Sequence, residues 1–158
     1  MGSLTFKEKQ RFDQWGLWIV IIILSLTPLA LSFIVEDRMG ISISLIAAFP
    51  LILLLLFTRL KTEISANGIS VKFFPIYVFD KVIKWEEIDR IYIRHYKPLS
   101  EFGGWGVRIS YKHGMAYNVK GKSGIQIEFK NGKKLLIGTQ RPEEAIKIID
   151  QYFKTTTL

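Results

Sequence analysis

Residues 125–137, IQIEFKNGKKLLI, carry a clear β-hairpin signal. Polar and apolar residues alternate through residues 125–130, which is the pattern of a strand with one buried face. An apolar return follows at residues 134–137, and the intervening Asn131-Gly132 favours a tight turn because both residues tolerate positive φ. The stretch therefore predicts two antiparallel strands and a fold built on β-sheet.

Similar patterns precede this hairpin in the sequence. Residues 66–68, Ala-Asn-Gly, are a second turn signal between the strand patterns of residues 63–65 and 69–73. Further strands are expected at residues 82–85, 90–95, 107–112 and, as a short one, 116–119. Seven strands are thus predicted, with residues 116–119 as one more short strand.

The chain is expected to end in an amphipathic helix that begins near Pro142. Proline suits the first turn of a helix, and Glu143 and Glu144 favour its N-terminal dipole. Apolar residues then recur at helical spacing, namely Ala145, Ile148, Ile149, Tyr152 and Phe153. Strands closed by one helix predict an α+β fold, a small bent sheet or barrel plugged by that helix.

Two uncharged runs, residues 14–35 and 39–58, precede the strand-rich part. Each is about 20 residues long, which as a helix spans roughly the 30 Å hydrocarbon core of a bilayer. They predict a transmembrane helical hairpin of about residues 15–35 and 39–58. A cleaved signal peptide is the alternative for the first run, but the apolar run continues past Ala30-Leu31-Ser32, where cleavage would fall.

The flanks of these runs predict their orientation. Basic residues lie before the first run and after the second, whereas Arg38 is the single basic residue between them; the flanking residues are Lys7, Lys9, Arg11, Arg59 and Lys61. Positive charge stays on the cytoplasmic side. We therefore expect a multi-pass inner-membrane protein with both termini cytoplasmic, divided into a segment 1–14, a hairpin 15–58 and a cytoplasmic domain 59–158.

Aromatic residues mark the expected membrane interface. Trp15 and Trp18 lie at the start of the first run, where an interfacial anchor is typical. The apolar stretch FFPIYVF, residues 73–79, is interpreted either as a loop at the interface or as core packing around an edge strand. Its aromatic residues are Phe73, Phe74, Tyr77 and Phe79.

Four segments, IKWEEIDRIYI (83–93), FGGWGVR (102–108), AYNVKGKSGIQIEF (116–129) and NGKKLLIGTQRPEEA (131–145), are similar to a group of bacterial two-span membrane proteins. Members of that group carry a C-terminal domain resembling the pleckstrin-homology superfold. The resemblance implies a seven-stranded bent sheet or barrel capped by a C-terminal helix and a membrane location, but no established activity. Inositide binding does not carry over, because Lys61 and Lys72 alone do not make the basic motif of the eukaryotic relatives.

The glycine-rich stretch Gly103-Gly104-Trp105-Gly106 raises the question of a phosphate loop. Its spacing matches neither common phosphate-binding pattern, and an alternating strand follows it where a helix would be needed. The glycines are therefore interpreted as a structural bend, with a ligand loop as the alternative.

Basic residues supply the candidate ligand-binding positions. Arg90 and Arg94 share one face of a predicted strand, as do Arg108 and Lys112 of another, so the four would form a basic face if the strands were neighbours. An ordinary solvated face is the competing interpretation. Gln140 and Arg141 form a second candidate, because they lie at a helix N-terminus, which suits anions.

The remaining patterns favour binding over catalysis. The chain has no cysteine, and His95 and His113 have no ligand-like or catalytic spacing, so no metal, cofactor or catalytic residue is expected. The net charge of +8 would draw the domain toward the anionic lipids of the cytoplasmic leaflet, and no motif that favours nucleic acid is present. We expect a membrane-anchored, non-catalytic interaction module that binds a protein partner or itself. The alternative is a sensor of lipid headgroups or small anions; an enzyme is third.

Overall fold

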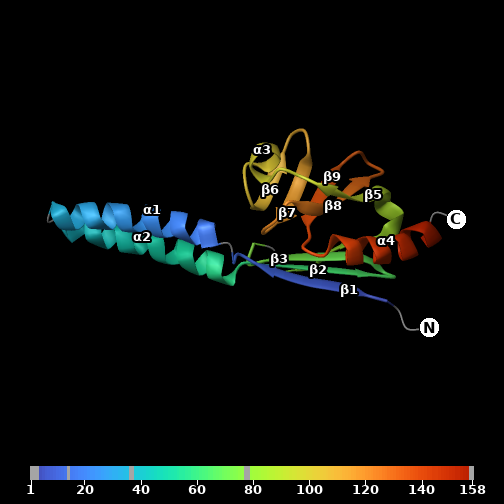
Figure 1. Cartoon of the computed structure of the whole chain (residues 1–158), viewed down its shortest axis with the longest axis horizontal. Helices are drawn as coiled ribbons and strands as arrows, with labels where there is room; N and C mark the ends of the chain where they lie inside the picture. The colour runs from blue at the N-terminus through green and yellow to red at the C-terminus, as the bar shows by residue number, and fades with distance from the viewer. Residues whose placement is uncertain (1–3, 14, 36–37, 77–78, 157–158) are drawn as a thin grey trace. The chain divides into compact units, whose positions relative to one another are not determined.

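A computed structural model describes residues 4–13, 15–35, 38–76 and 79–156 of the 158-residue chain. The chain forms two compact units. The β-sheet unit consists of Met1–Arg11 together with Arg59–Leu158, and the helical unit is Phe12–Thr58. The helical unit is thus an insertion between the first and second strands of the β-sheet unit (Figure 1).

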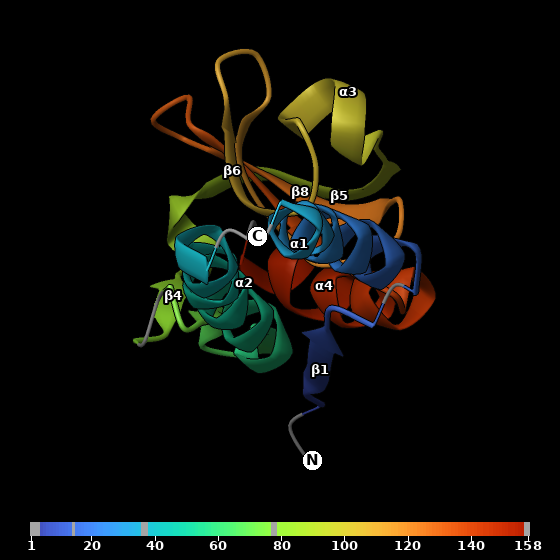
Figure 2. The ribbon, with the colours of Figure 1, turned by 90° about the vertical axis from the view of Figure 1, so that its left-hand side faces the viewer.

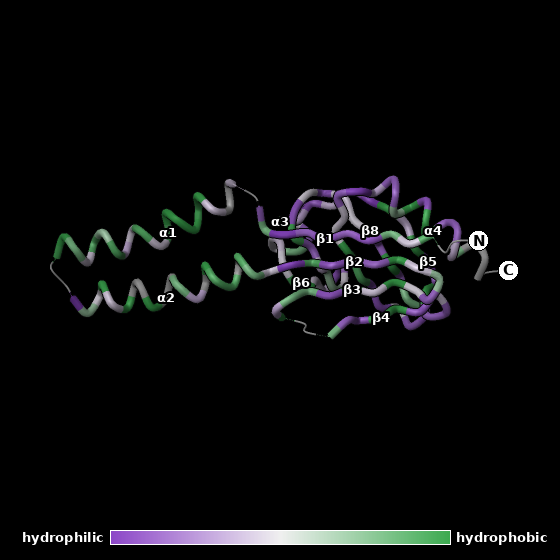
Figure 3. The backbone as a smooth tube through the Cα atoms, turned by 90° about the horizontal axis from the view of Figure 1, so that it is seen from below, coloured by the Kyte–Doolittle hydropathy of each residue, from purple (hydrophilic) through white to green (hydrophobic). Residues whose placement is uncertain are grey.

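The first sheet has four antiparallel strands in the order β1-β2-β3-β4 (Figure 3). These are β1 (Phe6–Arg11), β2 (Arg59–Ser65), β3 (Gly68–Phe74) and β4 (Lys81–Ile83). The turn predicted at residues 66–68 joins β2 to β3. Strand β1 lies outside every predicted element, although its sequence FKEKQR alternates strictly.

The second sheet has five strands in the order β5-β8-β9-β7-β6. These are β5 (Ile88–His95), β6 (Gly106–Ser110), β7 (Gly114–Asn118), β8 (Ser123–Phe129) and β9 (Lys134–Gly138). The hairpin predicted from residues 125–137 is present as β8 and β9, with Gly132 at φ 78° in its turn. Strands β7 and β9 pair in parallel, whereas the other pairs of this sheet are antiparallel.

Three helices belong to the β-sheet unit: a 3₁₀ turn η1 (Trp85–Glu87), the short α3 (Pro98–Phe102) and the C-terminal α4 (Pro142–Thr156). Helix α4 contacts strands of both sheets and lies between β1 and the second sheet when viewed end-on (Figure 2). Its buried Ala145 and Ile149 complete a core made by the inner faces of both sheets. The fully buried strand residues include Leu60, Ile64, Ile69, Phe73, Ile125, Ile127, Leu135 and Ile137.

The two uncharged runs form α1 (Trp15–Ile34) and α2 (Arg38–Phe57), each of 20 residues. Within the described residues, however, no helix has the length and apolar character needed to cross a membrane. This finding contradicts the predicted transmembrane hairpin and, with it, the multi-pass inner-membrane localisation with cytoplasmic termini. The prediction rested on the absence of charge and gave no weight to the proline and hydroxyl side chains that lie within both helices, among them Thr27, Pro28, Ser32, Ser42 and Pro50.

The predicted fold needs the same correction in its strand-rich part. We expected seven strands in one bent sheet or barrel behind a transmembrane hairpin, as the pleckstrin-homology resemblance implied. The described part of the chain is instead an α+β structure with five helices and two sheets of four and five strands. The difference arises because β1 joins the first sheet and because the β6–β7 hairpin extends the second sheet through the parallel β7–β9 pair.

Candidate functional site

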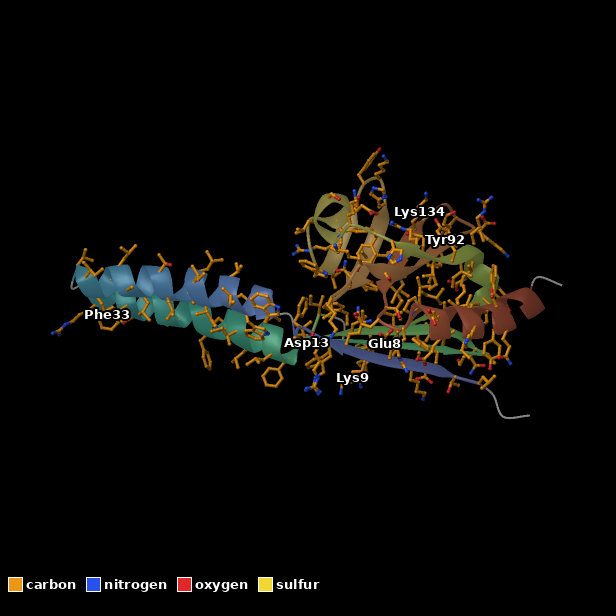
Figure 4. The ribbon with its side chains drawn as sticks, viewed as in Figure 1. Glu8, Lys9, Asp13, Phe33, Tyr92 and Lys134 are labelled. Atoms are coloured by element: carbon orange, nitrogen blue, oxygen red, sulfur yellow. The ribbon has the colours of Figure 1, made fainter. Side chains whose placement is uncertain are left out.

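The outer face of the first sheet carries a cluster of cations, which we call the basic face. It consists of Lys9 and Arg11 from β1, Arg59 and Lys61 from β2, and Lys72 from β3. Alternation along β1 creates this arrangement, since successive side chains point to opposite faces. Lys7, Lys9 and Arg11 are exposed, whereas Phe6, Glu8 and Gln10 are buried. Lys9 and Glu8 accordingly point to opposite sides of β1 (Figure 4).

Strand register places these cations beside one another. Lys9 is directly opposite Lys61, which is in turn opposite Lys72, so three ammonium groups share one line across three strands. Arg11 and Arg59 form the next line on the same face. Neighbouring strands are about 4.8 Å apart, and like charges directly opposite each other destabilise a sheet.

The crowding of positive charges lowers the pKa of Lys9. The Arg59 guanidinium lowers the pKa of Lys9 from its ordinary value, and desolvation, Arg11 and Lys61 lower it further. The Nε of Arg59 is buried and has no hydrogen-bond partner within the described residues. The face thus holds positive charge that its own strands do not neutralise.

Acidic residues lie at the margin of the basic face. Lys7 Nζ is 2.9 Å from Glu63 Oε1, and Lys72 Nζ is 3.5 Å from Asp80 Oδ1. Neither ion pair involves Lys9 or Lys61. Two hollows open on this face, one of about 380 Å³ that reaches Lys7 and Lys9 and one of about 210 Å³ beside Arg59 and Phe74; Lys61 and Lys72 line both.

The structure does not bring together the four cations of the second sheet that the sequence predicted to share a face. Strands β5 and β6 lie at opposite edges of that sheet, so Arg90 and Arg94 are not on strands neighbouring Arg108 and Lys112. Arg94 is instead engaged locally, with Nη1 2.8 Å from Glu101 Oε2 and Nε 2.9 Å from Gln126 Oε1.

The other three cations of that prediction are exposed. Arg90 has a distant ion pair with Asp89, at 3.9 Å. Arg108 Nε donates to the carbonyl oxygen of Trp105 at 3.0 Å, and Lys112 lies in the turn between β6 and β7. These contacts fit a solvated surface better than a shared ligand site.

The corner at Gln140 and Arg141 does bind an anion, but the anion belongs to the chain itself. The Glu8 carboxylate is 8% exposed and accepts hydrogen bonds from Thr139 Oγ1 at 2.7 Å and from the Gln140 amide at 2.8 Å. We call these contacts, together with the bond from Gln10 Nε2 to the Gly138 carbonyl at 2.7 Å, the Glu8 latch. It fixes β1 to the start of α4.

Arg141 strengthens the same attachment from outside. Its guanidinium lies 4.9 Å from the ring centroid of Phe6, donates to the Lys7 carbonyl and pairs with Glu144 at 3.0 Å. The positively polarised helix start is therefore occupied by groups of β1 and α4.

The glycine-rich stretch is a bend, as its structural interpretation proposed. Gly103 has φ 69° and caps the C-terminus of α3, and Gly104 and Gly106 also have positive φ. Strand β6 follows directly, and Trp105 is half-buried. These glycines supply backbone geometry that other residues rarely adopt.

The aromatic residues assigned to a membrane interface fall into different environments. Phe73 is 1% exposed and belongs to the core, whereas Phe74 and Phe79 are exposed. In the helical unit Trp15 is exposed, and Trp18 donates its indole N–H to the Phe12 carbonyl. Tyr77 lies outside the described residues. Among the described residues of this stretch, 73–76 and 79, Phe73 is the one aromatic residue that packs in the core.

Comparison with protein-family models gives no match to this chain, and comparison with curated proteins gives none either. The resemblance to two-span bacterial membrane proteins therefore stays a prediction. The basic face itself had a signal in the sequence, because residues 7–11 read K-x-K-x-R and residues 59–61 read R-x-K. The same charges were interpreted as cytoplasmic flanks of membrane helices.

The Glu8 latch yields a first prediction. Glu8→Gln keeps the side chain's size but replaces one of the two accepting oxygens with an NH2 group that faces a donor, so the free energy of unfolding is expected to fall by about 1–3 kcal/mol. Urea unfolding measures the change. Glu63→Gln, on the neighbouring strand but in an exposed ion pair, is the control and should cost less than about 1 kcal/mol. Equal losses in the two variants would show that the latch does not hold β1.

The crowding on the basic face yields a second prediction. Carbon-13 NMR titration should find the pKa of Lys9 below its ordinary value, and Arg59→Gln should raise it again; Arg90→Gln, in the other sheet, should leave it unchanged. Between the lowered pKa and the ordinary one the unfolded chain binds more protons, so stability should rise with pH in that window. An unchanged pKa in Arg59→Gln would contradict the assigned cause.

Proposed function

We propose that the protein is a non-catalytic binding module that holds an anionic partner on the basic face. The observation that carries the proposal is the line of Lys9, Lys61 and Lys72 on three adjacent strands, with Arg11 and Arg59 beside it. Opposed like charges lower stability, and such destabilising arrangements are typical of functional sites. A bound anion would relieve the repulsion.

The chemistry of the face suits binding. Arginine keeps its proton at any physiological pH and presents several N–H donors, so Arg11 and Arg59 supply fixed charge and hydrogen bonds. Lysine adds compact charge at three further points. Phosphate and carboxylate groups are the ligands that such cations bind by charge-assisted hydrogen bonds. The two hollows provide room for such groups between the side chains.

Titration with inorganic tripolyphosphate tests this function. Calorimetry should detect binding to the full chain that weakens as salt concentration rises, because exposed charges are screened. The triple variant Lys9→Gln, Lys61→Gln, Lys72→Gln should weaken binding by at least about tenfold, since it removes the central line of charge.

A matched triple variant separates a site from general charge. Lys84, Lys130 and Lys133 are exposed lysines elsewhere on the β-sheet unit, and their change to Gln removes the same net charge. Affinity in this control should stay within about twofold of the unaltered protein. Equal weakening in both triples would mean that binding follows net charge alone, and the proposal would fail.

A second candidate function, self-association, is favoured by the surface of the helical unit. Large apolar side chains are exposed along both helices, among them Ile22, Ile23, Leu24, Phe33, Ile46, Phe49 and Phe57. Extended exposed apolar surface marks an interaction site. The apolar surface between the ends of these helices carries no charge that would attract a charged partner, and the helical unit of a second copy presents an equally apolar surface. We therefore propose a second copy of the chain as its partner.

Oligomeric state tests this candidate. Sedimentation in a mild detergent, which suppresses non-specific aggregation, should reveal a discrete oligomer. Leu24→Gln, Ile46→Gln, Phe49→Gln together should shift it toward monomer, because each side chain is more than 60% exposed and would be covered in the assembly. The control changes Val82, Leu99 and Ile109, which are exposed on the β-sheet unit, to Gln. A monomer in the unaltered protein would overturn the candidate.

A further inference from the structure

A pocket of about 650 Å³ lies in the β-sheet unit, where β5 leads into α3. Its volume is within the range of small-molecule sites, about 300–1,000 Å³. Its lining residues are His95, Tyr96, Lys97, Pro98, Leu99, Ser100, Glu101, Trp105 and Lys122. None of them belongs to the basic face, so the pocket is independent of the proposed anion site.

The local sequence explains why this pocket is formed. Pro98 begins α3, and Gly103 in the left-handed conformation ends this helix of 5 residues. Phe102 is buried with its ring 6.1 Å from that of Tyr96 in an edge-to-face arrangement, which anchors the short helix. Leu99 on the same helix remains 68% exposed. Its apolar side chain is therefore available to a ligand.

Trp105 gives the pocket an aromatic surface. Its side chain is half-buried, and its indole N–H is 3.4 Å from the Gly121 carbonyl, longer than a typical hydrogen bond. The bend made by Gly104 and Gly106 holds this tryptophan between α3 and β6. Together with the exposed Leu99 it offers an apolar surface, behind which Pro98 is buried.

The charge of the pocket is positive, because its one carboxylate is neutralised. Burial by itself raises the pKa of Glu101, but the Lys97 amide, the Arg94 guanidinium and His113 together hold that pKa below its ordinary value. The contacts are short, with 2.7 Å from the Lys97 amide and 2.8 Å from Arg94 Nη1. Glu101 is therefore an ionised group that is already compensated.

The pocket lining also contains two lysines that lack an acidic partner among the described residues. Lys97 and Lys122 are exposed, come from different segments, and belong to none of the ion pairs in the described ranges of the chain. An apolar wall with two uncompensated ammonium groups complements a molecule that has a flat hydrophobic body and an acidic group.

We propose that this pocket binds a small aromatic acid, a carboxylate or sulfonate on a planar ring system. The ring packs on Trp105 and Leu99, and the acidic group pairs with Lys97 and Lys122. The two interactions are separable, because the ring contributes affinity through buried apolar area and the acid contributes through charge.

The experiment uses the full chain, 2-naphthoate as the probe and its neutral analogue 2-naphthamide. A ¹H–¹⁵N NMR titration should show a saturable shift of the Trp105 indole N–H with naphthoate. Trp105→Ala should weaken naphthoate binding at least about tenfold, whereas Trp105→Phe, which keeps an aromatic ring, should weaken it less. Both variants lack the indole reporter, so their affinity is measured from the shifts of the backbone amides of Lys97, Leu99 and Ser100. Retained spectral dispersion in either variant shows that the unit is still folded.

Charge recognition is tested by Lys97→Gln with Lys122→Gln. This variant should weaken naphthoate binding at least about fivefold and leave naphthamide binding unchanged, while Lys130→Gln with Lys133→Gln should alter neither. Absence of a saturable Trp105 shift would overturn the proposal, as would equal affinity for acid and amide in the unaltered protein. Failure here leaves the tripolyphosphate result unaffected, because the two sites share no residue.

Discussion

The β-sheet unit depends on one buried carboxylate, that of Glu8. Strand β1 is separated from β2 by the whole helical unit, so no tight turn sets its position. Backbone pairing with β2 aligns the strand, and the two hydrogen bonds that Glu8 accepts from Thr139 and Gln140 join it to the start of α4. A buried carboxylate is stable only when such donors satisfy it. The last helix and the first strand are thereby held as one structure.

The same strand connects the interior to the basic face. Because side chains alternate, the register that places Glu8 and Gln10 inside necessarily places Lys9 and Arg11 outside, opposite Lys61 and Arg59. A slip of one residue would expose the carboxylate and bury the cations. The internal hydrogen bonds therefore stabilise a register that the external charges alone would disfavour, and the basic face is assembled as a consequence of the core.

Local patterns in the sequence were sufficient for the hairpins and for α4, since Asn131-Gly132 and the helical spacing around Ile149 act over a few residues. Local patterns were not sufficient to predict how distant segments are arranged. Residues 7–11 alternate as a strand should, yet their charges equally suit the flank of a membrane helix, and only the pairing with β2 decides between the two. Likewise Arg94 and Arg108 have suitable periodicity, but sheet order separates their strands. The partner of Gln140 is 132 positions away and has no signal in the local sequence.

Lysine on an edge strand has a familiar explanation, because charged side chains keep exposed sheet edges from pairing with other molecules. Strand β1 is an edge, so this explanation covers Lys7, Lys9 and Arg11. It does not cover Arg59 and Lys61, which lie on β2 between two paired neighbours and protect no edge. Glutamate at position 61 would pair with both Lys9 and Lys72 at no cost to edge protection. Lys61 instead lies on a face where Arg59, Arg11 and Lys61 together lower the pKa of Lys9, and the proposed anionic partner would relieve this crowding.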